Sequence, residues 1–236
     1  MYLFVLAGGF GTRLRSIVSD VPKPLAPVMG EPFIAHLIVH WMDQGVKDFV
    51  FLLHYEAPKI KRLLKQMSYS SKFSGVTFKT ITEDVPLGTG GSVLNAIKKL
   101  NFEESFLVAN ADTWLGSGLS ILLKESPCAL AVVEVPNCQR YGSVIIEDAL
   151  ITKFKEKSDS IGQGYISSGL YHLTPSAFNG LAAGDSFSLE EIVFPKLVAK
   201  GQLSAVKLDV SFIDIGIPDD YLKFCNWMKL GKNTNL

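Results

Sequence analysis

The sequence lacks several features that would assign it to common protein classes. Of its 236 residues only three are cysteines, Cys128, Cys138 and Cys225, and their odd number and lack of CxxC spacing argue against a disulfide framework or a zinc knuckle. Neither charge sign is in surplus, because 23 Lys and Arg residues balance 23 Asp and Glu residues. This balance argues against nucleic acid or anionic membranes as partners. No apolar run approaches the roughly 20 residues of a membrane-spanning helix.

The beginning of the chain also lacks the basic n-region of a secretory signal peptide. Residues 1–7 form an apolar run that leads directly into Gly8 and Gly9, which is the pattern of a strand followed by a turn. We therefore expect a cytoplasmic protein. With 47% hydrophobic residues the chain can fill a large core, and no Pro- or Ser-rich linker interrupts it.

The order of hydrophobic patterns predicts an α/β fold. In the first half, short β-rich runs alternate with helical patterns, which is typical of βαβ units over a mostly parallel sheet. Strands are expected at 2–6, 46–53, 76–82 and 105–109, with helices at 33–44, 57–67 and 92–100. Further strands are expected at 129–135, 142–147, 151–156, 165–173, 203–208 and 212–215, with helices at 189–200 and 219–229. We predict one domain over residues 1–236, with parts at about 1–126 and 127–236.

A glycine-rich loop, residues 8–14, follows the first expected strand. Its glycines can turn the backbone tightly and direct N–H groups at an anion. The loop is not a Walker loop, and Leu14 stands where a dinucleotide fingerprint needs its third glycine. Arg13 in the loop and Lys23, which lies between two prolines, add two cations that could converge on one polyphosphate. On the glycines alone, a simple βα turn is an equally good interpretation.

Polar residues follow the strand expected at 105–109. Asn110 and Asp112 would lie at its carboxyl end, where open α/β sheets bind ligands. Taken alone, an Asp in such a place is more commonly a helix cap or a turn residue. Its interpretation therefore depends on the wider set of motifs.

Together these motifs resemble the signature of the sugar-1-phosphate nucleotidylyltransferases. Matching segments follow the family's order over almost the whole chain, at 6–14, 22–28, 86–92, 110–112, 141–142, 154–157, 168–171 and 212–216. Within the family, the short chain and the sequence of residues 212–221 resemble most the bacterial D-glycero-α-D-manno-heptose 1-phosphate guanylyltransferases.

The resemblance implies a Rossmann-like α/β fold of the nucleotide-diphospho-sugar transferase type. In this fold a mostly parallel mixed sheet is flanked by helices and joined to a smaller sugar-binding lobe. The implied reaction condenses a nucleoside triphosphate with a sugar 1-phosphate to give an NDP-sugar and pyrophosphate. The favoured substrates are GTP and D-glycero-α-D-manno-heptose 1-phosphate. Mg²⁺ is the implied cofactor, and the product would serve cell-surface polysaccharide synthesis. The resemblance leaves the oligomeric state open, and a homo-oligomer is among the alternatives.

The resemblance also implies which residues act. The catalytic residues would be Arg13 on the β- and γ-phosphates, Lys23 near the α-phosphate, and Asp112. Asp112 and Asp214 would hold Mg²⁺, which prefers oxygen ligands and substrate phosphates. The implied nucleotide-binding set is Leu6, Ala7, Gly8, Gly9, Gly11, Thr12, Arg13, Lys23, Glu83, Pro86, Gly88, Thr89 and Asp112. The implied sugar-phosphate-binding set is Gly142, Glu156, Lys157, Ser167 and Gly169.

The small residues between Pro86 and Gly91 would let a nucleobase lie against the backbone before a helix that we expect to begin near Ser92. Two positions depart from the family's pattern. Ala111 replaces the usual Gly, and we expect its methyl group to be tolerated. Ser167 replaces the usual Asn, so a contact to a sugar hydroxyl would be shortened or lost.

Two alternative functions stay open at this point. One is a uridylyl- or thymidylyltransferase for a hexose or N-acetylmuramate 1-phosphate, because the backbone edges near Ala7 and Gly88 would choose the base. The other is a nucleotide-sensing regulator that keeps the fold without the activity. The presence of Arg13, Lys23, Asp112 and Asp214 together argues against the regulator.

Overall fold

The computed structural model describes residues 1–14, 16–18, 21–125, 127–159 and 161–231. The chain divides into two compact units made of interleaved segments. The first unit comprises Met1–Val85, Ala109–Ser117 and Ser211–Leu236, and the second comprises Pro86–Val108 and Gly118–Val210. The chain thus passes between the units several times, whereas its sequence suggested one change near residue 126. That all 236 residues act as one nucleotidyltransferase domain stays a prediction.

The first unit contains a parallel sheet with the strand order β5-β4-β1. These strands are β1 (Tyr2–Leu6), β4 (Asp48–Leu53) and β5 (Thr77–Thr82). The side chains of Leu3, Phe4 and Val5 are wholly buried, as continuous apolar runs in parallel strands usually are. All three strands were predicted to within two residues of these bounds. Parallel strands end at the same edge of a sheet, so the loops after β1, β4 and β5 gather there.

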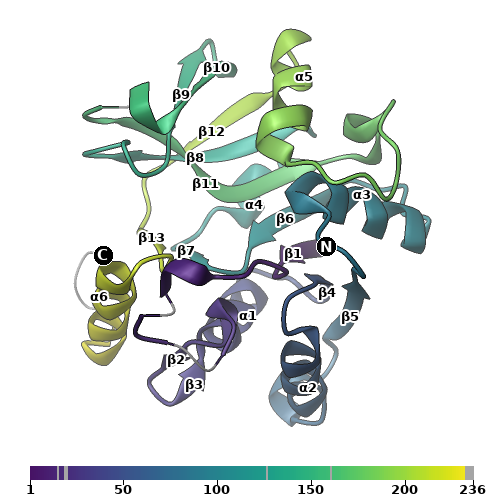
Figure 1. Ribbon diagram of the computed structural model, residues 1–236, viewed down its shortest axis with the longest axis vertical. Coiled ribbons are helices and arrows are strands. Elements are labelled where there is room, and N and C mark those ends of the chain that lie inside the picture. The colour runs from purple at the N-terminus through teal and green to yellow at the C-terminus, as the bar shows by residue number, and fades with distance from the viewer. Residues whose placement is uncertain (15, 19–20, 126, 160, 232–236) are drawn as a thin grey trace. The chain divides into compact units, whose positions relative to one another are not determined.

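Helices connect the strands of this sheet, and a further helix belongs to the same unit (Figure 1). α1 (Phe33–Asp43) joins β1 to β4, α2 (Ala57–Ser68) joins β4 to β5, and α6 (Pro218–Lys229) follows β13. α1 ends as predicted, because Gly45 has a φ of +95° and its N–H donates to the Met42 carbonyl at 2.9 Å. The remaining strands are short: β2 (Pro27–Val28), β3 (Glu31–Pro32), β7 (Thr113–Leu115) and β13 (Phe212–Asp214).

The second unit holds a mixed sheet with the order β11-β8-β12-β10-β9. β12 runs parallel to β8, and the pairs of β11 with β8 and of β10 with β9 and β12 are antiparallel. Its strands are β8 (Ala129–Val135), β9 (Ser143–Glu147), β10 (Leu150–Lys155), β11 (Gly164–Leu173) and β12 (Ser204–Leu208). α3 (Gly88–Leu100), α4 (Leu119–Leu122) and α5 (Phe194–Ala199) belong to the same unit. β6 (Phe106–Asn110) leads the chain from the second unit into the first.

Two helices differ from the sequence-based expectation. α3 begins at Gly88, so Gly88–Gly91 form its first turn and do not precede it. The helix expected at 189–200 is a π-helical turn, Leu189–Val193, followed by α5. Pro195 explains this break, because proline has no N–H to donate to the preceding turn. Among the described residues, no helix is both long and apolar enough to cross a lipid bilayer.

An aromatic cluster in the first unit fixes the segment that follows β6. The Trp114 ring lies 5.4 Å from Phe224 and 5.6 Å from Trp227, measured between ring centroids. Phe224 in turn meets Phe33 of α1 at 5.0 Å. Such pairs each add about 0.5–1.5 kcal/mol beyond their area burial. Because β7 is anchored in this way, Asp112, directly before it, has a defined position.

Candidate functional site

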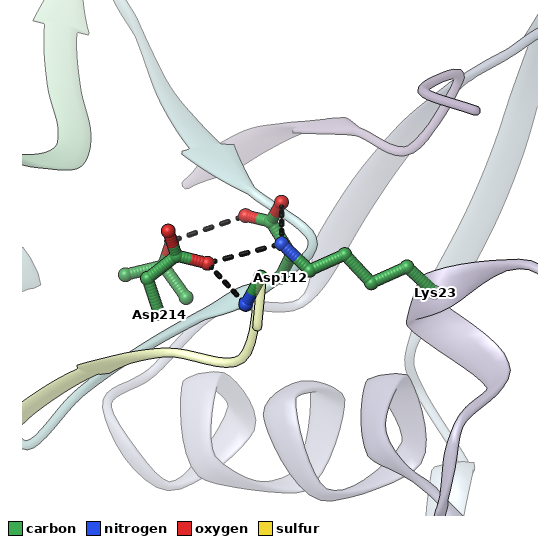
Figure 2. Close-up of polar contacts among 5 residues, drawn as sticks. Lys23, Asp112 and Asp214 are labelled. Atoms are coloured by element: carbon green, nitrogen blue, oxygen red, sulfur yellow. Dashed lines mark hydrogen bonds and ion pairs between the residues drawn. The ribbon is translucent and has the colours of Figure 1, made fainter. Parts of the chain in front are cut away.

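Three charged side chains from distant parts of the sequence meet in the first unit. The Lys23 ammonium lies 2.6 Å from Asp112 Oδ2 and 3.0 Å from Asp214 Oδ1. Figure 2 shows this ammonium between the two carboxylates. The Lys23 side chain is only 8% exposed, against 36% for Asp112 and 21% for Asp214. A buried lysine of this kind requires charged partners, and here it has two.

Backbone pairing of β7 with β13 places both carboxylates. Asp214, the last residue of β13, pairs with Thr113 of β7, and the Ile215 N–H donates to the Asp112 carbonyl at 3.0 Å. Each carboxylate is also oriented individually. The Thr113 hydroxyl donates to Asp112 Oδ1 at 3.1 Å, and the Gly216 N–H donates to Asp214 Oδ1 at 2.7 Å. The two side chains are therefore held with their oxygens toward one point.

Lys23 is held by the short turn that its flanking prolines favour. It begins a 3₁₀ helix, Lys23–Leu25, in which the Leu25 N–H donates to the Pro22 carbonyl at 2.8 Å. The glycine loop lies against the same residue. A Cβ placed on Gly11, whose φ is +58°, would stand 2.8 Å from the Lys23 Cβ. Only glycine fits this close approach, so Gly11 links the loop to Lys23.

The start of the glycine loop packs on the segment that follows β4. The Tyr55 N–H donates to the Gly8 carbonyl at 3.3 Å, and the Phe10 ring meets the His54 and Tyr55 rings at 5.8 and 5.3 Å. His54 Nδ1 is paired with the carbonyl of buried Glu83 at 3.2 Å. Gly8 and Glu83 are thus brought together around His54, at the shared edge of β1, β4 and β5.

The other predicted residues of the first unit lie within this loop or directly before it. The Leu6 carbonyl accepts from the Ala111 N–H at 3.1 Å, and the Ala7 N–H donates to the Leu52 carbonyl at 3.0 Å. Ala111 is buried and has a φ outside the left-handed region, so its methyl group is accommodated as expected. Thr12 and Arg13 lie exposed on a 3₁₀ helix, Thr12–Leu14, and a Cβ on Gly9 would meet nothing within 4 Å.

The cluster of Lys23, Asp112 and Asp214 has the composition of a site for a hard cation. Its two carboxylates already converge on one positive group, at 2.6 and 3.0 Å. Within the described ranges, no group of three or more His, Cys, Asp or Glu side chains is arranged to hold a metal. Two carboxylates without further protein ligands suit Mg²⁺, which usually keeps waters and completes its shell with substrate phosphates. The residues present therefore fit the implied Mg²⁺.

The predicted sugar-phosphate residues all lie in the second unit, in two groups. A Cβ on Gly142, which has a φ of +80°, would stand 2.8 Å from the Lys155 carbonyl oxygen and 3.9 Å from the backbone nitrogen of Lys157. Gly142 thus lies against the exposed pair Glu156 and Lys157, which follow β10.

The second group is on β11. The Gly169 N–H, at a residue with a φ of +74°, donates to the Ser167 hydroxyl at 3.4 Å. The pairing of β11 with β8 shifts register between Ser167 and Tyr171. The matching segment at 168–171 therefore falls where the strand pairing is interrupted as in a β-bulge, a feature common beside binding sites.

Pro86 and Gly88 lie exposed at the start of α3, and Thr89 is half-buried. The Thr89 hydroxyl is already used by the protein, since it donates to Glu190 Oε2 at 2.9 Å and accepts from the Leu189 N–H at 2.8 Å. Sequence reasoning missed Glu190, and it also missed Gly216 and Thr113 as partners of the two aspartates. Gly216, two residues after Asp214, carries the signal of an Asx turn, whereas Glu190 has no local signal.

Three comparisons relate the chain to known proteins. Residues 3–229 match the family described as nucleotidyl transferase. The chain is 37% identical over 229 residues to the D-glycero-alpha-D-manno-heptose 1-phosphate guanylyltransferase of Campylobacter jejuni, covering 95% of this chain and 98% of that one. It is 31% identical over 228 residues to the enzyme of the same name from Aneurinibacillus thermoaerophilus, covering 94% and 96% of the two chains.

The structure is also similar to that of HddC from Yersinia pseudotuberculosis complexed with GMP-PN. The TM-score is 0.82 at 33% identity, over 96% of this chain and 99% of that chain. This likeness confirms the fold class that the sequence predicted.

Proposed function

Because the chain belongs to the nucleotidyl transferase family, which it matches over residues 3–229, we propose that it transfers a nucleotidyl group from GTP to a sugar 1-phosphate. The products are a GDP-sugar and pyrophosphate, and the favoured acceptor is D-glycero-α-D-manno-heptose 1-phosphate. The observation that carries this proposal is the 37% identity over 95% of the chain to a guanylyltransferase named for that sugar. The charged cluster of Lys23, Asp112 and Asp214 supports a reaction at phosphate groups.

The reaction needs no nucleophilic side chain. A phosphate oxygen of the sugar 1-phosphate, already ionised, attacks the α-phosphorus of GTP. The new bond joins this oxygen to phosphorus, while the bond from the α-phosphorus to the bridging β-oxygen breaks and pyrophosphate leaves with its electron pair. Alignment of the two substrates can supply on the order of 7–11 kcal/mol of the barrier. The remaining requirement is neutralisation of charge on the crowded phosphates.

The chain's own residues supply cations and hydrogen-bond donors for these phosphates. The N–H groups of the open loop around Gly9 bind the triphosphate, and exposed Arg13 neutralises the departing pyrophosphate. Lys23, brought to the loop by Gly11, holds the α-phosphate region. Asp112 and Asp214 would hold Mg²⁺, whose chemistry is to neutralise and orient phosphate oxygens. Glu156 and Lys157 bind the sugar hydroxyls and the sugar phosphate.

The test incubates the purified protein and Mg²⁺ with every pairing of a nucleoside triphosphate and a sugar 1-phosphate from a panel. Pyrophosphate release and the mass of the product are measured for each pair. The proposal predicts release with GTP and the heptose 1-phosphate, and weaker release with hexose 1-phosphates. Release with UTP or dTTP but not with GTP would contradict the guanylyl assignment. Tight GTP binding with no release from any pair would favour the non-catalytic regulator.

A further inference from the structure

The first turn of α3 is enclosed by a segment of the same unit, residues 185–190. The Phe187 carbonyl accepts hydrogen bonds from the N–H groups of Gly90 at 3.0 Å and Gly91 at 3.1 Å. The Phe187 N–H donates to the Leu87 carbonyl at 3.0 Å. Amides at a helix N-terminus are normally free to bind an anion. Here two of them are taken by the protein itself.

The glycines of this turn are required by the enclosing segment. A Cβ on Gly88, whose φ is +70°, would stand 2.5 Å from the Phe187 carbonyl oxygen. A Cβ on Gly91 would stand 2.4 Å from the Asp185 carbonyl oxygen. Both distances are shorter than any real Cβ contact. The small residues that the sequence offered to a nucleobase therefore serve, at these two positions, the packing of the chain on itself.

Glu190 joins this enclosed turn to β11. Its Oε2 accepts a hydrogen bond from the Thr89 hydroxyl at 2.9 Å, and its Oε1 accepts one from the Tyr171 hydroxyl at 3.3 Å. Tyr171 is buried, and its ring meets Phe194 edge-on at 5.1 Å. One carboxylate thus binds a residue of the predicted nucleotide set and a residue two positions beyond Gly169 of the predicted sugar set.

We propose that Glu190 is a positioning residue that holds the nucleotide-binding turn, Pro86–Thr89, at a fixed place against β11, which carries Ser167 and Gly169. This inference rests on the proposed function. An ionised carboxylate has two acceptor oxygens and can satisfy both hydroxyls. Glutamine has one acceptor oxygen and a donating amide, so it can accept a hydrogen bond from only one of the two hydroxyls. Glu190→Gln therefore weakens the connection between the Pro86–Thr89 turn and β11 with little change in side-chain volume.

The kinetic test compares Glu190→Gln with Glu191→Gln, which neutralises the neighbouring exposed carboxylate. Glu190→Gln should raise the KM values for GTP and for the sugar 1-phosphate about tenfold, the loss expected for a hydrogen bond to a charged group, with kcat changed much less. Glu191→Gln should behave like the wild type. Unchanged KM values in Glu190→Gln, or a fall in kcat alone that reflects fewer folded molecules, would overturn the proposal.

A double-mutant cycle shows whether the link runs through the named hydroxyl. Thr89→Val removes that hydroxyl, so its effect on KM for GTP should not add to that of Glu190→Gln. Full additivity would overturn the proposal, because the two residues would then act separately.

Hydrogen exchange separates this inference from the proposed function, since it needs no turnover. The Gly90 and Gly91 amides should be protected in the wild type and should exchange faster in Glu190→Gln. Equal exchange rates in the two proteins would overturn the positioning role even if the enzyme is active. Absence of turnover in the wild type, with the predicted change in exchange, would instead overturn the proposed function alone.

Discussion

The Lys23 ammonium already pairs with the two carboxylates that would bind Mg²⁺ and compensates one of their two negative charges. A divalent cation must therefore compete with the ammonium for oxygens that now lie 2.6 and 3.0 Å from it. We predict that Lys23→Met binds Mn²⁺, used as a spectroscopic substitute for Mg²⁺, about tenfold more tightly than the wild type, because two unpaired carboxylates attract a cation strongly. Titration followed by electron paramagnetic resonance of free Mn²⁺ measures this affinity directly.

The matched control for this prediction is Lys61→Met on the exposed face of α2, which makes the same change in net charge. It should leave Mn²⁺ affinity unchanged. Equal or weaker Mn²⁺ binding by folded Lys23→Met would mean that the ammonium does not compete with the metal.

Replacing two glycines of the glycine loop by alanine should have different effects. Gly9→Ala places a methyl group in open space, so we predict unchanged thermal stability and a KM for GTP raised about tenfold by the clash with phosphate. Gly11→Ala forces alanine to a φ of +58° and brings its Cβ within 2.8 Å of the Lys23 Cβ. The backbone strain alone should cost about 1–2 kcal/mol of stability. Denaturant unfolding and GTP kinetics measure both quantities.

If Gly9→Ala keeps the wild-type KM for GTP, the loop does not contact the triphosphate. If Gly11→Ala unfolds at the wild-type denaturant concentration, the close approach to Lys23 does not constrain the loop.

At the scale of elements, the sequence predicted long, periodic segments well and short ones poorly. β1, α1 and α2 were predicted nearly to the residue, because apolar runs and a C-terminal glycine mark them. The three-residue strand β7 carries no periodicity of its own and was not predicted, whereas its partner β13 was expected at 212–215. Together the two strands position both aspartates. The sequence therefore offered candidate site residues more readily than the elements that place them.

The first turn of α3 was misjudged for a related reason. Glycine disfavours a helix interior, so four residues with three glycines favoured a loop before Ser92. Tertiary packing reverses this preference, because Phe187 accepts from two amides of the turn. A contact between residues nearly 100 positions apart leaves no local pattern that a single sequence can reveal.

A buried histidine on β11 should make the second unit sensitive to acid. His172 is only 3% exposed, so its ring lies away from solvent. Burial lowers the pKa of His172 below its ordinary 6.5, and the nearby Leu122 and Glu125 carbonyls offset this only in part. The unfolded chain therefore takes up a proton at a higher pH than the folded chain.

We predict that the free energy of unfolding falls as the pH drops below 6.5 toward the lower folded-state pKa of His172. His172→Phe, which keeps a ring of similar size without a titrating group, should flatten this part of the pH profile. Urea unfolding at a series of pH values measures it. An identical pH dependence in the two proteins would show that His172 does not contribute.

At the scale of the whole molecule, the predicted site residues are divided between the units. The glycine loop, Lys23, Asp112 and Asp214 belong to the first unit, whereas the start of α3 and the sugar-phosphate residues belong to the second. The sequence predicted both sets through their resemblance to a family. It could not predict the ion pairs of Lys23, because the partners lie 89 and 191 positions away.

Metal removal should therefore affect activity and stability differently. Because the Lys23 ammonium forms ion pairs with both Asp112 and Asp214 in the absence of metal, we predict that chelation with EDTA abolishes turnover while the free energy of unfolding changes by less than about 0.5 kcal/mol. Calorimetry of the chelated and Mg²⁺-loaded protein without nucleotide tests this. A large loss of stability on chelation would assign the metal a structural role.

The central claim is that the chain transfers a GMP group to a sugar 1-phosphate. The most direct measurement follows ³²P from the α-position of GTP during incubation with D-glycero-α-D-manno-heptose 1-phosphate and Mg²⁺. The account predicts that the label appears in a GDP-sugar, that pyrophosphate forms in equal amount, and that Asp112→Asn abolishes both. Label that remains in GTP, or that appears in free GMP or GDP without a GDP-sugar, would contradict it.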